Sequence, residues 1–318
     1  MKKILVVLAA AVLVLSFAGA ALAIHAEIPA ETQAIVAKGS TQITLGGEIR
    51  VRGWYYNNLA PYGTAAVPGT PVESNSKANW DQRVRLNIDA QVTPNVQAYI
   101  QLESSTAIDG QKDTWTWGNL NTKPATMNIA QAWILYTGSG LFGFNSGLKV
   151  GHMPLKLGEG QFFDNTQFGD DAVVFFMDPT KELHIGLLTI KASDGSTGDN
   201  TDDLDAYVGL MTYKIAKTHT LGMNYTYINK SDWALKFQNL GLHANGTAGK
   251  FGYKAEVDFQ FGSVDEGADK AKFRGVGVFL AANYKVTPEF NLRGSFAYGS
   301  GDTEEDNKNT EFQTLVGT

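Results

Sequence analysis

The sequence has 318 residues, with 26 Lys and Arg against 32 Asp and Glu, and it contains no cysteine. A net charge of −6 without a basic patch or tail argues against a nucleic-acid-binding protein. A chain without cysteine must be stable without disulfides. Charged residues make up 18% of the chain, below the quarter usual for soluble domains, whereas aromatic residues reach 11%.

The chain begins with the pattern of a secretory signal peptide. Lys2 and Lys3 precede an apolar run over residues 4–17, and the small residues Ala21 and Ala23 flank a cleavage position. This run is too short for a membrane-spanning helix, and no later segment approaches 18 apolar residues. We therefore expect residues 1–23 to be a signal peptide, which is removed after export.

Residues 24–40 are expected to form an N-terminal periplasmic segment with a short helix. The stretch 27–38 has Pro29 in its first turn and Gly39 after its last residue. Proline near the start and glycine just past the end are typical of a helix.

From residue 41 onward, apolar and polar residues alternate with a period of two, which indicates strands with two different faces. The run 251–261, for example, has aromatic and aliphatic residues at odd positions and Lys, Glu, Asp and Gln at even positions. Alternation is weaker over 171–177 and 183–192. About thirteen strands are expected, over 42–56, 81–92, 96–103, 127–137, 148–153, 171–177, 183–192, 204–214, 219–229, 235–245, 251–261, 272–286 and 290–299.

Three features favour a transmembrane antiparallel up-and-down β-barrel over residues 41–318 rather than a soluble sandwich. The clearest runs are about 10 to 14 residues long, as tilted membrane strands are. Aromatic residues gather near strand ends, as in interfacial girdles: Trp54, Tyr55, Tyr56, Trp133, Tyr136, Tyr225, Tyr227, Phe296 and Tyr298. Long polar connections also alternate with short ones, as external loops do with periplasmic turns. The long connections cover 58–79, 105–125, 154–170, 193–203 and 262–271; the short ones lie at 93–95, 178–180, 246–249 and 287–289.

Thirteen is an odd number, whereas bacterial single-chain barrels have an even number of strands. The acidic stretch after Gly299 also lacks an apolar strand with a terminal aromatic residue. We therefore expect the sequence to be the N-terminal portion of a barrel of about 16–18 strands. The alternative is a strand count that is wrong by one.

Motifs for catalysis, metals or cofactors do not emerge from the sequence. The five histidines are dispersed, and the G-x-G-x-x-G match over 138–143 precedes no helix, so a glycine-rich turn explains it better. The aspartates within 194–205 lack the EF-hand pattern and favour a solvated loop over a calcium site. The sequence therefore predicts no enzyme, no cofactor and no metal.

Charged residues lie on the polar faces of the expected strands. If 58–79 is a hairpin loop, Arg52 falls opposite Arg85, and four arginines share one wall of the lumen. Such charges persist where water screens them and where an anion can pair with them, and rings of charge tune the selectivity of a pore. The alternative is that these side chains only pair with one another in water. The expected pore-lining residues are Glu48, Arg50, Arg52, Arg83, Arg85, Asp89, Glu103, Glu256 and Asp258.

The segment 150–176 is expected to contain a loop that folds inward and narrows the pore. Gly158 and Gly160 permit tight bends, and Phe162, Phe163 and Phe168 are too apolar for a freely solvated loop. The alternative is an external loop packed on the barrel rim. The expected polar lining is Lys156, Glu159, Asp164, Asp170 and Asp171.

The stretches ITLGGEIRVRGWYYNN, DQRVRLNIDAQVTPN and VGHMPLKLGEGQFFDNTQFGDDAVVFFMDPTKELHIGLLTIK resemble alginate-export-type outer-membrane porins. The chain also resembles uncharacterised delta-proteobacterial porins of that superfamily, over most of residues 24–318. The resemblance implies a monomeric barrel, larger than the strands found here, that passes small or anionic solutes. Arg50, Arg52, Arg83 and Arg85 lie where an arginine-rich lumen is expected, while the acidic residues depart from an alginate-exporting lumen.

These observations predict an outer-membrane porin for passive diffusion of small hydrophilic or anionic solutes, with membrane lipid as its surroundings. The alternative in the same membrane is a structural barrel that sheathes or anchors a periplasmic or surface partner, such as a cytochrome, or acts as an adhesin. A soluble periplasmic sugar-binding β-protein and a catalytic barrel are further alternatives.

Overall fold

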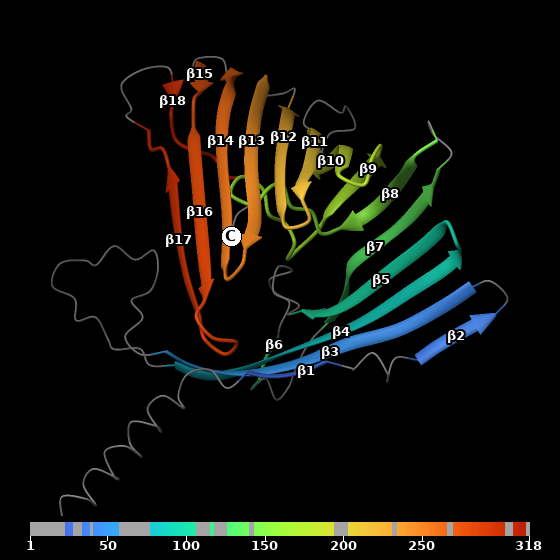
Figure 1. Ribbon diagram of the computed structural model, residues 1–318. Helices are drawn as coiled ribbons and strands as arrows, with labels where there is room; N and C mark the ends of the chain where they lie inside the picture. Colours follow the sequence, from blue (N-terminus) through green and yellow to red (C-terminus); the bar gives the residue numbers. More distant parts are fainter. Residues whose placement is uncertain are drawn as a thin grey trace, which may run out of the picture. The chain divides into compact units, whose positions relative to one another are not determined.

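The computed structural model describes residues 23–27, 34–38, 41–56, 77–105, 115–117, 126–139, 143–193, 203–230, 234–265, 270–302 and 308–315. The described elements are all strands, so the expected all-β antiparallel up-and-down fold is confirmed (Figure 1). The chain divides into two compact units: residues 1–90 with 100–130, and residues 91–99 with 131–318.

Unit 1 is built from strands near the start of the sequence. Its strands are β1 (Ala23–Glu27), β2 (Ala34–Lys38), β3 (Thr41–Tyr56), β4 (Lys77–Thr93) and β6 (Trp115–Thr116), together with most of β5 (Val96–Ser105). β1 and β2 both pair antiparallel with β3, through Ala26 opposite Ile49 and Val36 opposite Ile43. The short helix expected over 27–38 is therefore wrong where residues are described, and the sheet starts before residue 41. The β-branched residues Ile35 and Val36 favour a strand, and the pairing of β2 with β3 overrides the expected helix.

Unit 2 is a run of long antiparallel strands, each paired with the next along the chain. They are β7 (Thr126–Gly138, from Gln131 on), β8 (Asn145–Met153), β9 (Asp170–Asp178), β10 (Leu183–Ser193), β11 (Leu204–Ala216), β12 (His219–Lys230), β13 (Leu235–Ala248), β14 (Phe251–Asp265), β16 (Val276–Lys285) and β17 (Asn291–Gly299). Every one of these strands overlaps a strand expected from the sequence.

One expected strand, 272–286, is broken in two. β15 (Lys270–Phe273) and β16 are separated by Arg274 and Gly275, and the two-residue β18 (Lys308–Asn309) pairs parallel with β15. Arg274 donates its N–H to the carbonyl of Asn309, and a Cβ at Gly275 would lie within 3.0 Å of Gln260, Glu311 and Phe312. The polar stretch after β17 therefore packs against the sheet at the point where the strand breaks.

Some neighbouring strands of unit 2 are joined by turns of only two residues, and these turns lie at the same end of the sheet. Two residues, Lys217 and Thr218, join β11 to β12, and Gly249 and Lys250 join β13 to β14. Gly249 has a φ of 60°, which glycine adopts without steric cost. The described connection 154–169, at the opposite end, is much longer. The expected difference between long and short connections is thus present in this unit.

Candidate functional site

The two faces of β12, β13 and β14 have opposite chemistry, and their burial is the reverse of that in a soluble protein. On one face Asn239 and Asp258 are fully buried, while Leu242 and Phe259 on the other face are each 42% exposed. We call the first the polar face, and it carries Asn224, Thr226, Asn239, Glu256, Asp258 and Gln260. The second, the apolar face, carries Leu221, Met223, Tyr225, Leu242, Phe251, Phe259 and Phe261.

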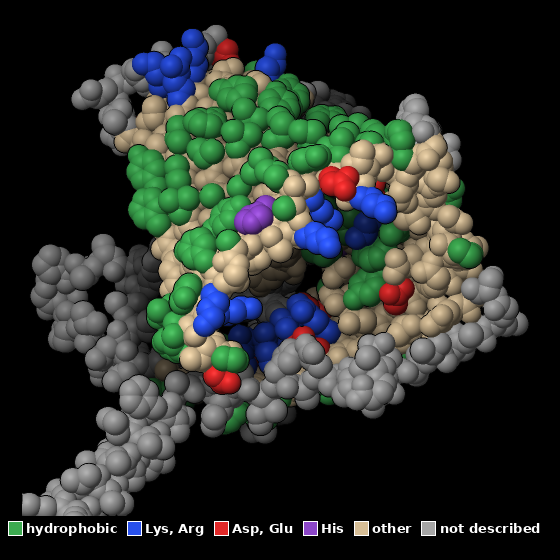
Figure 2. Space-filling model, in the orientation of Figure 1, with side chains coloured by type: hydrophobic (Ala, Val, Ile, Leu, Met, Phe, Trp, Pro, Cys, Tyr) green, Lys and Arg blue, Asp and Glu red, His purple; other side chains and the backbone are tan. Residues whose placement is uncertain are grey.

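Large hydrophobic side chains gather over the strands of unit 2 in Figure 2. The predicted split of β14, with aromatic residues on one face and Glu256, Asp258 and Gln260 on the other, agrees with the observed burial pattern. Burying polar groups while exposing apolar ones is unfavourable in water, because each hydrophobic side chain loses the free energy of burial. Lipid removes this penalty for the apolar face.

The loop over residues 154–169, which we call the covering loop, lies on the polar face. A carboxylate oxygen of Glu256 accepts the backbone N–H of Glu159 at 2.8 Å and of Gln161 at 3.2 Å. Glu159 in turn accepts hydrogen bonds from Lys254 of β14, at 2.6 Å, and from Asn245 of β13, at 2.8 Å. The loop is thereby fixed to side chains of β13 and β14 on the polar face.

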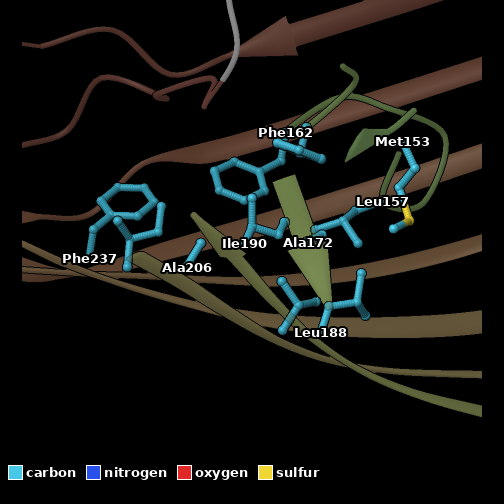
Figure 3. Close-up of a cluster of buried hydrophobic side chains, with 11 residues drawn as sticks. Met153, Leu157, Phe162, Ala172, Leu188, Ile190, Ala206 and Phe237 are labelled. Carbon is cyan, nitrogen blue, oxygen red and sulfur yellow. The ribbon is translucent and has the colours of Figure 1, made fainter. Parts of the chain in front are cut away.

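Apolar side chains hold the other part of the covering loop. Leu157, Phe162 and Phe163 are at most 3% exposed and belong to one cluster with Leu188, Ile190, Val208 and Phe237 of the sheet. Figure 3 shows Leu157 and Phe162 lying against the strands that carry Ile190, Ala206 and Phe237. Phe162 stacks on Phe237 with ring centroids 6.0 Å apart. Burial of each phenylalanine contributes about 1.5–3 kcal/mol, so the cluster is the main hydrophobic attachment of the loop.

Charged residues stabilise the loop internally and at its contact with the sheet. Lys156 forms an ion pair with Asp164 at 3.2 Å, and Asp164 also accepts hydrogen bonds from Thr166. Burial alone would raise the pKa of Glu159, but the bonds from Lys254 and Asn245 and the charge of Lys156 outweigh it and lower this pKa. The pKa of Asp164 is likewise lowered, since its bonds to Thr166 and Lys156 outweigh its burial. Both carboxylates are therefore charged at neutral pH.

The predicted loop residues do not all lie in the loop. Lys156, Glu159 and Asp164 do, whereas Asp170 and Asp171 are the first two residues of β9. Asp170 accepts a hydrogen bond from Asn165 at 2.8 Å, and the exposed Asp171 pairs with His152 of β8 at 2.9 Å. Phe168 is 41% exposed, so only two of the three loop phenylalanines are buried.

The predicted arginine wall of unit 1 is a ladder of ion pairs. Arg52 binds Asp81 at 2.9 and 3.1 Å. Arg83 donates to Glu48 at 3.0 Å, and Arg85 to Glu103. The side-chain contacts do not match the expected alignment of Arg52 with Arg85, because Arg52 binds Asp81 and Arg85 binds Glu103. Arg50 and Asp89 lie on β3 and β4 and also have interaction partners.

Several residues of these two faces were not singled out from the sequence. Asp81 shares its strand face with Arg83 and Arg85, so the alternation that identified the arginines also contains the signal for Asp81. Asn224, Thr226 and Asn239 are uncharged, and nothing in the pattern distinguishes them from other polar strand residues. Glu256 and Asp258 were predicted as pore-lining residues; both are buried, and Glu256 binds the covering loop.

Two of the predicted girdle aromatics have other contacts. Trp54 donates to Asp81 and lies under the Arg52 guanidinium, 4.7 Å from the ring centroid. Trp133 stacks on Tyr99, with centroids 5.2 Å apart, and packs against the buried cluster. Tyr55, Tyr136, Tyr225, Phe296 and Tyr298, by contrast, are exposed, as an interfacial girdle requires.

The described part of the chain contains no group of three or more His, Asp or Glu arranged around a metal position. Asp203 and Asp205, from the acidic stretch considered for calcium, both pair with Lys191; Asp194, Asp199 and Asp202 lie outside the described residues. Among the residues that the structure describes, no helix is long and apolar enough to cross a membrane.

No protein-family profile and no curated protein sequence matches the chain. Among solved structures, Salmonella typhi OmpF in complex with daunomycin is similar at 10% sequence identity, with a TM-score of 0.43. The similarity covers 87% of this chain and 97% of that chain. A likeness this distant supports no inference about function, and the proposals below rest on the residues of this chain.

Proposed function

We propose that this protein is an outer-membrane porin, in which the strands form a transmembrane barrel that lets small hydrophilic solutes diffuse passively. The observation that carries the proposal is the reversed burial of unit 2, with an exposed apolar face and a buried polar face on the same strands. In an outer-membrane barrel the apolar face contacts lipid, and the polar face lines the lumen.

The ladder of unit 1 supports a pore wall of balanced charge. Arg50, Arg52, Arg83 and Arg85 stand against Glu48, Asp81, Asp89 and Glu103, so four positive charges meet four negative ones. We propose that these residues line the pore with only a weak preference for anions. A reversal potential measured in a salt gradient tests this part: a strong selectivity of either sign would contradict it.

We further propose that the covering loop narrows the pore, because its attachment to Glu256 and Lys254 places it over the polar face of the strands. Deleting residues 158–168 should raise the single-channel conductance in planar bilayers several-fold. An unchanged conductance would remove the constriction from the proposal while leaving the porin itself in place.

The second candidate is a non-conducting structural barrel that sheathes or anchors a protein partner. The apolar cluster between the covering loop and the sheet favours it, since side chains there fill space that a wide pore would leave open. Planar-bilayer recording of the purified full-length protein separates the two: discrete conductance steps support the porin, and their absence supports the structural barrel.

A further inference from the structure

Polar atoms without hydrogen-bond partners are concentrated on the polar face. Asn224 is 1% exposed, and neither its oxygen nor its nitrogen has a partner within the described chain. Three more atoms likewise lack a hydrogen-bond partner within the described chain: Oγ1 of Thr226, Oδ1 of Asn239 and Oδ2 of Asp258. Each of these residues is at most 1% exposed. Buried polar groups are rarely left without partners, so such a concentration indicates a bound ion or ordered water.

Backbone register brings these four side chains together from three adjacent strands. Asn224 of β12 and Asp258 of β14 both lie opposite Gly241 of β13. Because Gly241 has no side chain, the other two lean over it: a Cβ there would lie 2.7 Å from Nδ2 of Asn224 and 2.7 Å from Oδ1 of Asp258. Thr226 lies opposite Asn239, which donates to Oδ1 of Asp258 at 2.8 Å.

We propose that Asp258, Asn224, Asn239 and Thr226 form a binding site for a hard divalent cation of the calcium class. Carboxylate, amide and hydroxyl oxygens are the ligands that such cations take, and calcium tolerates irregular sets that water completes. Oδ2 of Asp258 and Oδ1 of Asn239 both remain available, because the bond between these residues uses Oδ1 of Asp258 and Nδ2 of Asn239.

The surrounding charge favours a divalent ion over a monovalent one. Glu256 lies two residues from Asp258 on the same face, which adds a second carboxylate nearby. Lys254, the cation on the same face of β14, is engaged by Glu159 at 2.6 Å. The site is distinct from the proposed pore function, since it depends on no flow of solute.

Isothermal titration of the full-length protein with calcium chloride, in detergent micelles, tests the site. We expect one saturable calcium per chain with a Kd of about 0.1–1 mM, the range of extracellular calcium modules. Asp258→Asn should weaken binding at least about tenfold because it removes the only charged ligand of the set. Asp171→Asn, which removes an exposed carboxylate from β9, should leave binding unchanged.

Asp258→Asn also removes a negative charge, which could weaken calcium binding by itself. Two further variants leave the charge of the protein unchanged and therefore test the ligand geometry. Asn224→Ala removes a ligand, and Gly241→Ala places a methyl group where the side chains converge; both should weaken calcium binding while the folded form persists on unheated electrophoresis gels. No saturable binding by the natural protein, or binding that only Asp258→Asn reduces, would overturn the proposal. The first outcome would assign the buried atoms to ordered water, and the second would reduce the site to general attraction by a carboxylate.

Discussion

The charged face of unit 1 and the polar face of unit 2 satisfy their buried carboxylates in different ways. In unit 1, Glu48, Asp81 and Glu103 bind arginines of neighbouring strands, so side chains of the sheet neutralise one another. In unit 2, Glu256 accepts two backbone N–H groups of the covering loop. The carboxylates of unit 1 are therefore neutralised by side chains of the sheet itself. Glu256, by contrast, keeps its hydrogen-bond donors only while the covering loop stays bound to the sheet.

The largest loss of folding stability is expected when one partner of an ion pair in the unit 1 ladder is removed. Arg83→Met leaves Glu48 without this partner, and the side chains of the pair are only 10% and 14% exposed. Removing one partner of a buried pair costs about 3–5 kcal/mol. Urea titration of the folded protein in lipid vesicles, followed by tryptophan fluorescence, measures the loss. The double variant Arg83→Met with Glu48→Gln should recover most of it, and a single variant as stable as the natural protein would refute the ladder.

A smaller loss of stability and a larger change in the loop are expected from Glu256→Ala. The variant removes the acceptor of the N–H groups of Glu159 and Gln161, and each of these half-buried hydrogen bonds contributes about 0.5–1.5 kcal/mol net, because a detached loop exposes both N–H groups to water. The covering loop should detach, and trypsin should then cleave after Lys156. The matched variant Glu103→Ala, which removes a carboxylate of unit 1, should leave that cleavage site protected. Equal protection in both variants would show that Glu256 does not hold the loop.

Acid should release the covering loop through Glu159. Its pKa is lowered from the usual value of 4.5, because the bonds from Lys254 and Asn245 and the charge of Lys156 outweigh its burial. A lowered pKa means that the carboxylate stabilises the docked loop above the usual value, and that this contribution is lost as pH falls through the lowered one. Conductance should therefore change only as the pH falls below the usual value of 4.5. Glu256 and Asp164 also face this region, so the decisive result is the difference from Glu159→Gln, which should lack this component.

The smallest effect is expected for the ion pair within the loop itself. Lys156 and Asp164 are 36% and 34% exposed, and exposed pairs contribute about 0–1 kcal/mol. Lys156→Ala should change the urea midpoint only slightly and should leave conductance close to that of the natural protein. A loss comparable to that of Arg83→Met would mean that the loop depends on this pair more than on Glu256.

Most of the strands could be predicted from the sequence because alternation reports which residues share a face. The two strands with weak alternation, β9 and β10, were still predicted, and the structure shows why the pattern is weaker there. Ala172, Leu188 and Ile190 face the covering loop and are buried by Phe162 and Phe163, so both faces of these strands are apolar. The weak alternation therefore reflects the covering loop, because the interior face of these two strands carries apolar residues that pack against the loop.

Register was harder to predict than strand position. The expected alignment of Arg52 with Arg85 assumed a hairpin loop over 58–79, whereas Arg52 binds Asp81, four positions earlier on that strand. The predicted register would place two arginines opposite each other, whereas the observed contacts pair each arginine with a carboxylate. Both registers leave the charged residues on the same face of the strands. The convergence of Asn224 and Asp258 over Gly241 could not be predicted either, because it requires the register of three strands at once.

The central claim is that β13 has one face toward lipid and one toward the polar interior, and spin labels can test it directly. The natural chain has no cysteine, so single cysteines can be introduced at residues 236–246 and labelled after the protein is folded in vesicles. Collision with oxygen dissolved in lipid should be high at even positions such as Leu240 and Leu242, and low at odd positions such as Asn239 and Gly241, with a period of two. High accessibility of the even positions to a water-soluble nickel reagent, with no response to lipid-phase oxygen, would contradict the account.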